Sequence, residues 1–130
     1  IPAMEPLQLS LMTGWSGFLG GVFSGAVMGL LFHREDWLGG YGSRERRMVR
    51  LGHISFFGIG LINLFYALSL APLGVPAAAA RFGSIALLVA LVTMPSCCFL
   101  CAWRKPFRHL FFIPVLSAAA GIAVILFSRS

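Results

Sequence analysis

Histidine and cysteine are the residues of this chain that could hold a metal ion or a haem. The sequence has three of each, and they recur near one end of successive apolar segments: His33, His53, Cys97, Cys98, Cys101 and His109. Imidazole nitrogen and thiolate sulfur are common protein ligands of transition metals and of haem iron. If those segments are membrane helices, all six residues lie in the inner half of one bundle, and the pattern raises the hypothesis of a cofactor site there.

A haem b site would need one or two inward-facing imidazoles, apolar walls and small residues beside the macrocycle. His53 is the best candidate for the first ligand, because it lies within an apolar run and is followed by two phenylalanines and Gly60. His109 or His33 would supply the second ligand. The motif C-x-x-C-H is absent from the sequence, which argues against covalent haem attachment.

The three cysteines suggest a different site, for a copper or zinc ion. Cys98 and Cys101 are three residues apart, and Cys97 and Cys101 are four apart, so a helix would make them neighbours. His109 would add a nitrogen ligand. The alternative is purely structural, since buried cysteine packs as a small hydrophobe and histidine is tolerated where a helix reaches headgroup water.

Four long apolar segments must position these side chains. Hydrophobic residues make up 58% of the 130 residues, and charged residues only 11%, against about a quarter charged in a soluble domain. A helix needs about 20 apolar residues to cross the hydrocarbon core. Four segments meet this requirement, namely 9–32, 51–71, 82–102 and 107–128. The sequence therefore predicts an all-α integral membrane protein, with residues 1–130 forming a single four-helix bundle.

Basic residues are distributed unevenly between the two sides of this predicted bundle. The first and third connections with their flanks hold Arg34, Arg44, Arg46, Arg47, Arg50, Arg104, Lys105 and Arg108, and the opposite side holds Arg81 and Arg129. The positive-inside rule then places the basic loops in the cytoplasm and both termini outside, as in a bacterial inner membrane. We expect the basic residues to contact anionic lipid headgroups rather than nucleic acid, because they flank apolar runs.

The basic tract before the second segment also predicts a helix start. Ser43 is a residue type that caps the first free N–H groups of a helix. We expect the residues from Ser43 to Arg50 to form a solvated, lipid-facing turn at headgroup level.

The first segment carries a repeat of small residues. Gly17, Gly21, Gly25 and Gly29 recur every four residues and so form one helix face without side chains. Such a face lets a second helix approach closely in lipid. Two partners are open, either another helix of the same chain or another subunit. Asn63, near the middle of the second segment, is expected to hydrogen-bond across a helix interface.

These patterns favour some functions over others. The four acidic residues lie outside the apolar segments, whereas proton or cation transport usually requires ionisable groups within the membrane. No Walker motif, H-E-x-x-H or nucleophile elbow is present in the sequence. The sequence favours a non-catalytic accessory subunit that packs through its glycine face with another membrane protein or a second copy. A haem- or metal-binding electron carrier is the alternative, and a small transporter or channel is third.

Overall fold

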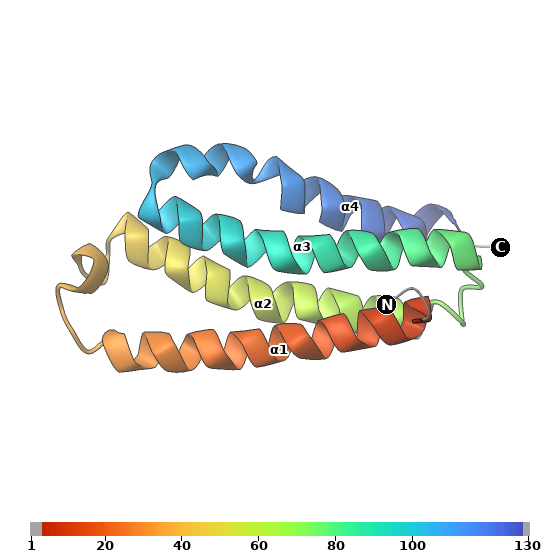
Figure 1. The fold of residues 1–130 in the computed structure, drawn as a ribbon, viewed down its shortest axis with the longest axis horizontal. Helices are drawn as coiled ribbons and strands as arrows, with labels where there is room; N and C mark the ends of the chain where they lie inside the picture. The colour runs from red at the N-terminus through yellow and green to blue at the C-terminus, as the bar shows by residue number, and fades with distance from the viewer. Residues whose placement is uncertain (1–3, 129–130) are drawn as a thin grey trace.

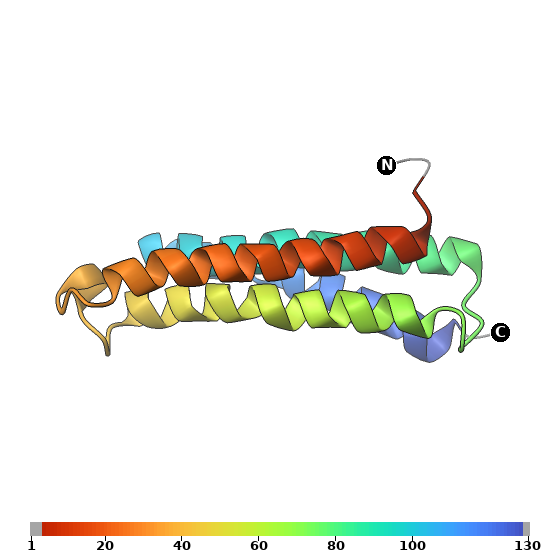
Figure 2. The same ribbon diagram turned by 90° about the horizontal axis from the view of Figure 1, so that it is seen from below.

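The computed structural model describes residues 4–128, which form a four-helix bundle (Figure 1). Its elements are α1 (Pro6–Leu31), η1 (Trp37–Gly39), α2 (Arg44–Ser69), α3 (Ala77–Trp103), η2 (Lys105–Leu110) and α4 (Phe112–Phe127), where η1 and η2 are 3-10 segments. Successive helices run in opposite directions, so α1 begins and α4 ends at the same end of the bundle (Figures 1 and 2). The prediction of an all-helical bundle is confirmed. Four segments are long and apolar enough to cross a membrane, the fourth being η2 together with α4.

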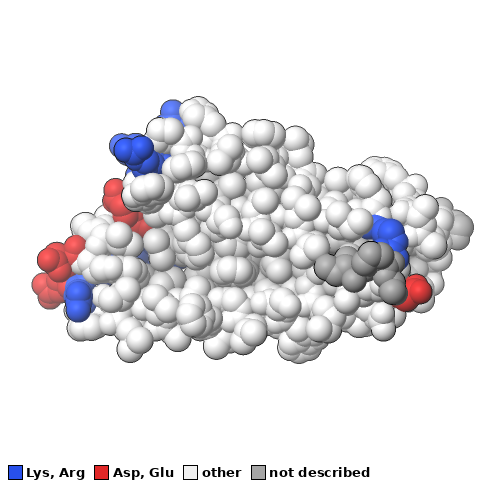
Figure 3. Space-filling model, in the orientation of Figure 1, with Lys and Arg blue, Asp and Glu red and all other residues white. Residues whose placement is uncertain are grey.

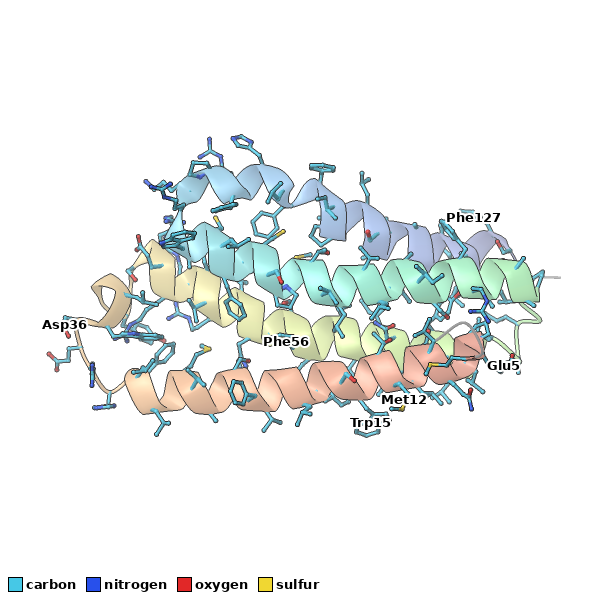
Figure 4. All side chains as sticks on the ribbon, viewed as in Figure 1. Glu5, Met12, Trp15, Asp36, Phe56 and Phe127 are labelled. Carbon is cyan, nitrogen blue, oxygen red and sulfur yellow. The ribbon has the colours of Figure 1, made fainter. Side chains whose placement is uncertain are left out.

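The outer surface of the bundle is apolar between two charged ends. Large hydrophobic side chains project from all four helices, and Trp15 and Phe127 are 61% and 82% exposed. In Figure 3 the charged residues gather at the two ends of the visible face, with a broad uncharged surface between them. Figure 4 shows Trp15 pointing away from the bundle, and Glu5 and Asp36 at opposite ends. Exposing so much apolar surface to water is unfavourable by about 25 cal/mol per Å².

Two glycines face each other where the backbones of α1 and α2 come close together. A methyl group on Gly14 would lie 2.8 Å from the carbonyl oxygen of Gly60, and one on Gly60 would lie 3.1 Å from the carbonyl oxygen of Gly14. Backbone atoms cannot rotate aside as a side chain can. The absence of both side chains therefore sets the distance between these two helices.

Most of the predicted glycine face of α1 is covered by the same chain. A methyl group on Gly21 would lie 2.5 Å from the ring of Phe57, and Gly17 and Gly25 also face side chains of the bundle at 2.7 Å. Gly29 differs, because no atom lies within 4 Å of the position its methyl group would take. Of the two partners that the sequence left open, the structure places α2 and α3 against the first three glycines.

Buried hydrogen bonds join α1, α2 and α3 at the end where α1 begins. The hydroxyl of Ser10 donates to that of Ser84 (2.9 Å), which donates to the carbonyl of Pro6 (3.0 Å). The hydroxyl of Tyr66 donates to the carbonyl of Ala80 (2.8 Å). Because a buried hydroxyl without a partner is costly, these bonds favour one arrangement of the three helices.

Asn63 lies in the same interior and is fully buried. Its Nδ2 donates to the carbonyl of Ile59 in its own helix (2.9 Å) and to the carbonyl of Leu87 in α3 (3.4 Å). The hydrogen bond expected across a helix interface is therefore made to α3. Within residues 4–128, its Oδ1 has no hydrogen-bond partner.

The fourth segment differs from the continuous helix expected over 107–128. The chain first forms η2 and then begins α4 at Phe112. Pro114 explains the break, because proline has no N–H to donate to the carbonyl of Leu110 and its ring would collide with that carbonyl. Proline is well tolerated in the first turn of a helix, and that is where Pro114 lies in α4.

Candidate functional site at the basic end

The structure does not bring the three histidines together. His33 and His109 are both exposed, the first between α1 and η1 and the second in η2. His53 is half-buried between α1 and α2. Its Nδ1 lies 2.9 Å from the hydroxyl oxygen of Ser24, and its ring meets the Phe57 ring edge-on with centroids 5.4 Å apart.

The contacts of His53 fix the orientation of its ring. The hydroxyl of Ser24 donates to the carbonyl of Gly21 (3.1 Å), and a hydroxyl has only one proton to donate. In the tautomer with its proton on Nδ1, His53 donates to the Ser24 hydroxyl. A methyl group on Gly25 would lie 2.7 Å from the Cε1 of His53, so Gly25 provides the space for this ring.

The three cysteines are buried, unpaired thiols on α3, and they meet different neighbours. The Sγ of Cys97 lies 3.7 Å from the carbonyl of Leu110, and the Sγ of Cys101 lies 3.7 Å from Nη1 of Arg44. Cys98 lines an apolar groove. Among residues 4–128, no group of three or more His, Cys, Asp or Glu side chains is arranged to hold a metal ion. The haem and metal hypotheses thus find no converging set of ligands in this part of the chain.

Arg46 is buried at this end of the bundle and is only 2% exposed. Its Nε donates to the carbonyl of Trp37 (2.7 Å), and its Nη2 donates to the carbonyl of Arg34. The guanidinium also lies 5.0 Å from the ring centroid of Phe32 and 5.6 Å from that of Trp37, which is within the range of a cation–π contact. These contacts tie the connection after α1 to the first turn of α2.

Ser43 caps α2 as the sequence predicted. Its hydroxyl accepts from the backbone N–H of Arg46 (3.1 Å) and donates to the carbonyl of Leu38 (2.7 Å). The prediction of a solvated, lipid-facing turn is wrong for Arg46. Carbonyl groups and two aromatic rings of the α1–α2 connection surround its charge in place of water or headgroups.

Arg44 connects the start of α2 to the end of α3. Its Nη1 donates to the carbonyl of Cys101 (2.7 Å), one of the last carbonyls of α3, where a positive charge also offsets the helix dipole. Its Nη2 lies 3.5 Å from a carboxylate oxygen of Glu45, a partly exposed pair that contributes little to stability. The Nε of Arg44 is buried and has no hydrogen-bond partner among the described residues.

Two apolar grooves open on the half of the bundle nearest the basic loops. The first groove, of about 350 Å³, lies over α2 between α1 and α3 and is lined by residues such as Val27, Phe56 and Phe99. The second, of about 400 Å³, lies between α2, α3 and Phe111 at the start of α4. Smaller grooves, of about 270 Å³ beside Pro6 and about 190 Å³ beside Tyr66, lie toward the opposite end.

Sequence reasoning missed the packing roles of three residues that organise the bundle, namely Gly14, Arg44 and Arg46. Gly14 lies seven residues before Gly21 and so shares its helix face, a signal that could have identified it. No comparable signal distinguishes Arg46 from its neighbours, because the first turn of α2 holds three arginines.

In comparisons with known proteins, the chain matches no family model, no curated protein and no solved structure.

Proposed function

We propose that this chain is a small, non-catalytic integral membrane protein that crosses a bilayer four times and serves as an accessory subunit. The observation that carries this proposal is the apolar surface between two charged ends (Figure 3). Lipid chains solvate such a surface, and headgroups solvate the ends. The excess of basic residues around η1 and η2 favours the cytoplasm for that end, and a bacterial inner membrane is the setting proposed.

The interior supports a packing role. The buried polar side chains are engaged in hydrogen bonds between or within helices, as with Ser10, Ser84 and Tyr66. Three of the four predicted glycines are also engaged within the chain. A partner would therefore meet the outward face of α1, where Ala26 and Gly29 are exposed and leave room for the backbone of another helix.

Insertion is tested by washing native membranes with alkaline carbonate and then floating the detergent-purified chain with lipid vesicles. The proposal predicts that the chain stays in the washed membrane and floats with the vesicles. Release by carbonate, or recovery from the unfloated fraction, would overturn it.

The accessory role is tested by cross-linking in native membranes, followed by mass measurement of the purified complex. We expect a complex with another membrane protein or a second copy, and we expect Gly29→Leu to weaken it. Gly58→Leu is the matched control, because Gly58 also has no atom within 4 Å of the position of a methyl group but lies on α2. If the chain forms no complex, or if Gly29→Leu leaves the complex intact, the outward face of α1 is not the partner-binding surface.

A further inference from the structure

The second groove is open because α4 packs against α2 only farther along, where Val124 and Tyr66 share a buried cluster with Leu87. Gly121 brings α4 against α3, where a methyl group would lie 2.5 Å from the side chain of Leu87. Pro114 interrupts the fourth segment and separates η2 from α4. The space left beside α2 is lined by Met48, Leu51, Gly58, Met94, Cys98 and Phe111, among others. Beyond the backbone of its own helix, no atom lies within 4 Å of the position that a methyl group on Gly58 would take, so no side chain of the protein fills the groove at this point.

Arg44 lies one helical turn before Met48, which lines the groove at the end nearest the basic loops. Residues four and seven positions apart share a helix face, so Arg44 is on the face of α2 that carries Met48 and Leu51. Its hydrogen-bond partner Cys101 is one turn beyond Cys98, which lines the opposite wall. An apolar groove therefore ends at a cation.

The guanidinium of Arg44 retains an unused donor. Its Nη1 and Nη2 have partners, but its Nε is buried and has none within residues 4–128. This buried N–H is out of reach of a ligand, but the side chain as a whole is 28% exposed, and the carbonyl of Cys101 and the carboxylate of Glu45 do not use all of its Nη hydrogens. An anionic oxygen at the end of the groove would accept from a remaining Nη–H, and arginine binds phosphate oxygens through such charge-assisted hydrogen bonds. Arg47, in the first turn of α2, and Arg108, in η2, are exposed at the basic end of the bundle and add positive charge there.

We propose that this groove holds one acyl chain of an anionic phospholipid, with the lipid phosphate hydrogen-bonded to Arg44. The apolar walls match the chain, and the cation at the groove's end matches the phosphate. A helix from a second copy fits less well, because the carbonyl groups of a membrane helix are already used within that helix and leave no acceptor for Arg44. The proposal rests on the membrane insertion proposed above and adds a specific lipid site to it.

The test is native mass spectrometry of the full chain in mild detergent with an equimolar mixture of phosphatidylglycerol and phosphatidylcholine that carry identical acyl chains. We expect a complex with one lipid in which phosphatidylglycerol predominates. Gly58→Phe should abolish this complex by filling the groove. Gly29→Phe is the matched control and should retain it, since both glycines have open space beside them.

The charge requirement is tested separately with Arg44→Gln. Removing one basic residue near a phosphate should reduce the preference for phosphatidylglycerol about fivefold, whereas Arg34→Gln, which changes an exposed arginine before η1, should leave it unchanged. Circular dichroism confirms that each variant is folded, and Gly58→Leu replaces Gly58→Phe if the larger residue prevents folding.

Three results overturn the lipid site. They are equal binding of the two lipids, a lipid complex that survives groove filling, and a dimer in place of the complex with one lipid. Vesicle flotation of the same preparation distinguishes the two proposals. A chain that floats but shows no preference for phosphatidylglycerol contradicts the lipid site alone, and one that does not float contradicts membrane insertion itself.

Discussion

At the scale of single residues, the glycines of α1 differ in the neighbour that each one meets. That neighbour determines the effect of adding a side chain. Gly14 faces the Leu64 side chain and the Gly60 carbonyl, Gly21 faces a ring, and Gly29 faces open space. A spacing of four residues in the sequence identifies a face without side chains. It does not identify the neighbour, because the neighbour depends on how other helices pack.

We predict that Gly14→Ala destabilises the bundle by about 1–3 kcal/mol, the usual effect of overpacking. The new methyl group would meet the carbonyl of Gly60 at 2.8 Å, and the two helices would have to separate. Gly29→Ala should instead be neutral or stabilising by up to about 1 kcal/mol, because alanine favours the helix. Unfolding by sodium dodecyl sulfate in mixed micelles, followed by circular dichroism, measures both. Equal stability of the two variants would contradict the close approach at Gly14.

Arg46 and Arg47 provide a second comparison between adjacent residues. Arg46→Gln should destabilise the bundle by about 2–3 kcal/mol, because hydrogen bonds from a buried, charged donor to two backbone carbonyls are lost. Arg47 is exposed and donates to the carbonyl of Gly42 at the surface, so Arg47→Gln should change stability by less than about 0.5 kcal/mol. The same micelle titration measures the difference in stability between the two variants. It is read by the fluorescence of Trp37, with the other tryptophans replaced by phenylalanine. Similar losses from both substitutions would rule out a special role for Arg46.

At the scale of helices, the number and approximate positions of the elements could be predicted, because length and hydropathy determine them. Hydropathy does not determine the exact starts, although the capping residue Ser43 did predict that of α2. Helix α2 begins at Arg44, well before the apolar run at Leu51, because arginine is a good helix former and Ser43 provides the cap. The break before α4 depends on where Pro114 lies relative to Leu110, and proline alone does not show whether a helix bends or stops.

The docking of α4 can be tested through Cys97, whose thiol lies against Leu110. Gly121→Leu should displace α4 from the fully buried Leu87 and so accelerate alkylation of Cys97 by N-ethylmaleimide in detergent. Ala119→Leu adds the same side chain to an exposed position of α4 and should leave the rate unchanged. Peptide mass spectrometry identifies which thiol reacts. An unchanged rate in Gly121→Leu would show that α4 is not held at this glycine.

At the scale of the whole molecule, the two ends of the bundle differ in construction. Buried hydrogen bonds join three helices at the end where α1 begins, and the larger of the described grooves open toward the basic loops. The sequence located the histidines and cysteines near the basic end, but it could not show that they have different neighbours. Which side chains converge depends on helix rotation, and a rotation of half a turn exchanges an inward residue for an outward one.

The charge asymmetry also belongs to the whole molecule, and most of it lies within the described residues. Arg129, which the sequence analysis counted on the less basic side, lies outside them. Gly42, in the basic α1–α2 connection, and Ala71, in the α2–α3 connection at the opposite end, are both exposed. A bilayer crossed by four helices must separate these two positions.

The most direct test of the four-span topology is therefore to label Gly42→Cys and Ala71→Cys with a membrane-impermeant maleimide. The labelling is done in bacterial spheroplasts and in inverted membrane vesicles. The unsubstituted chain gives the background, since its three cysteines are no more than 6% exposed. The account predicts that Ala71→Cys reacts only in spheroplasts and Gly42→Cys only in inverted vesicles. Reaction of both positions from the same side would contradict a four-span membrane protein with its basic loops in the cytoplasm.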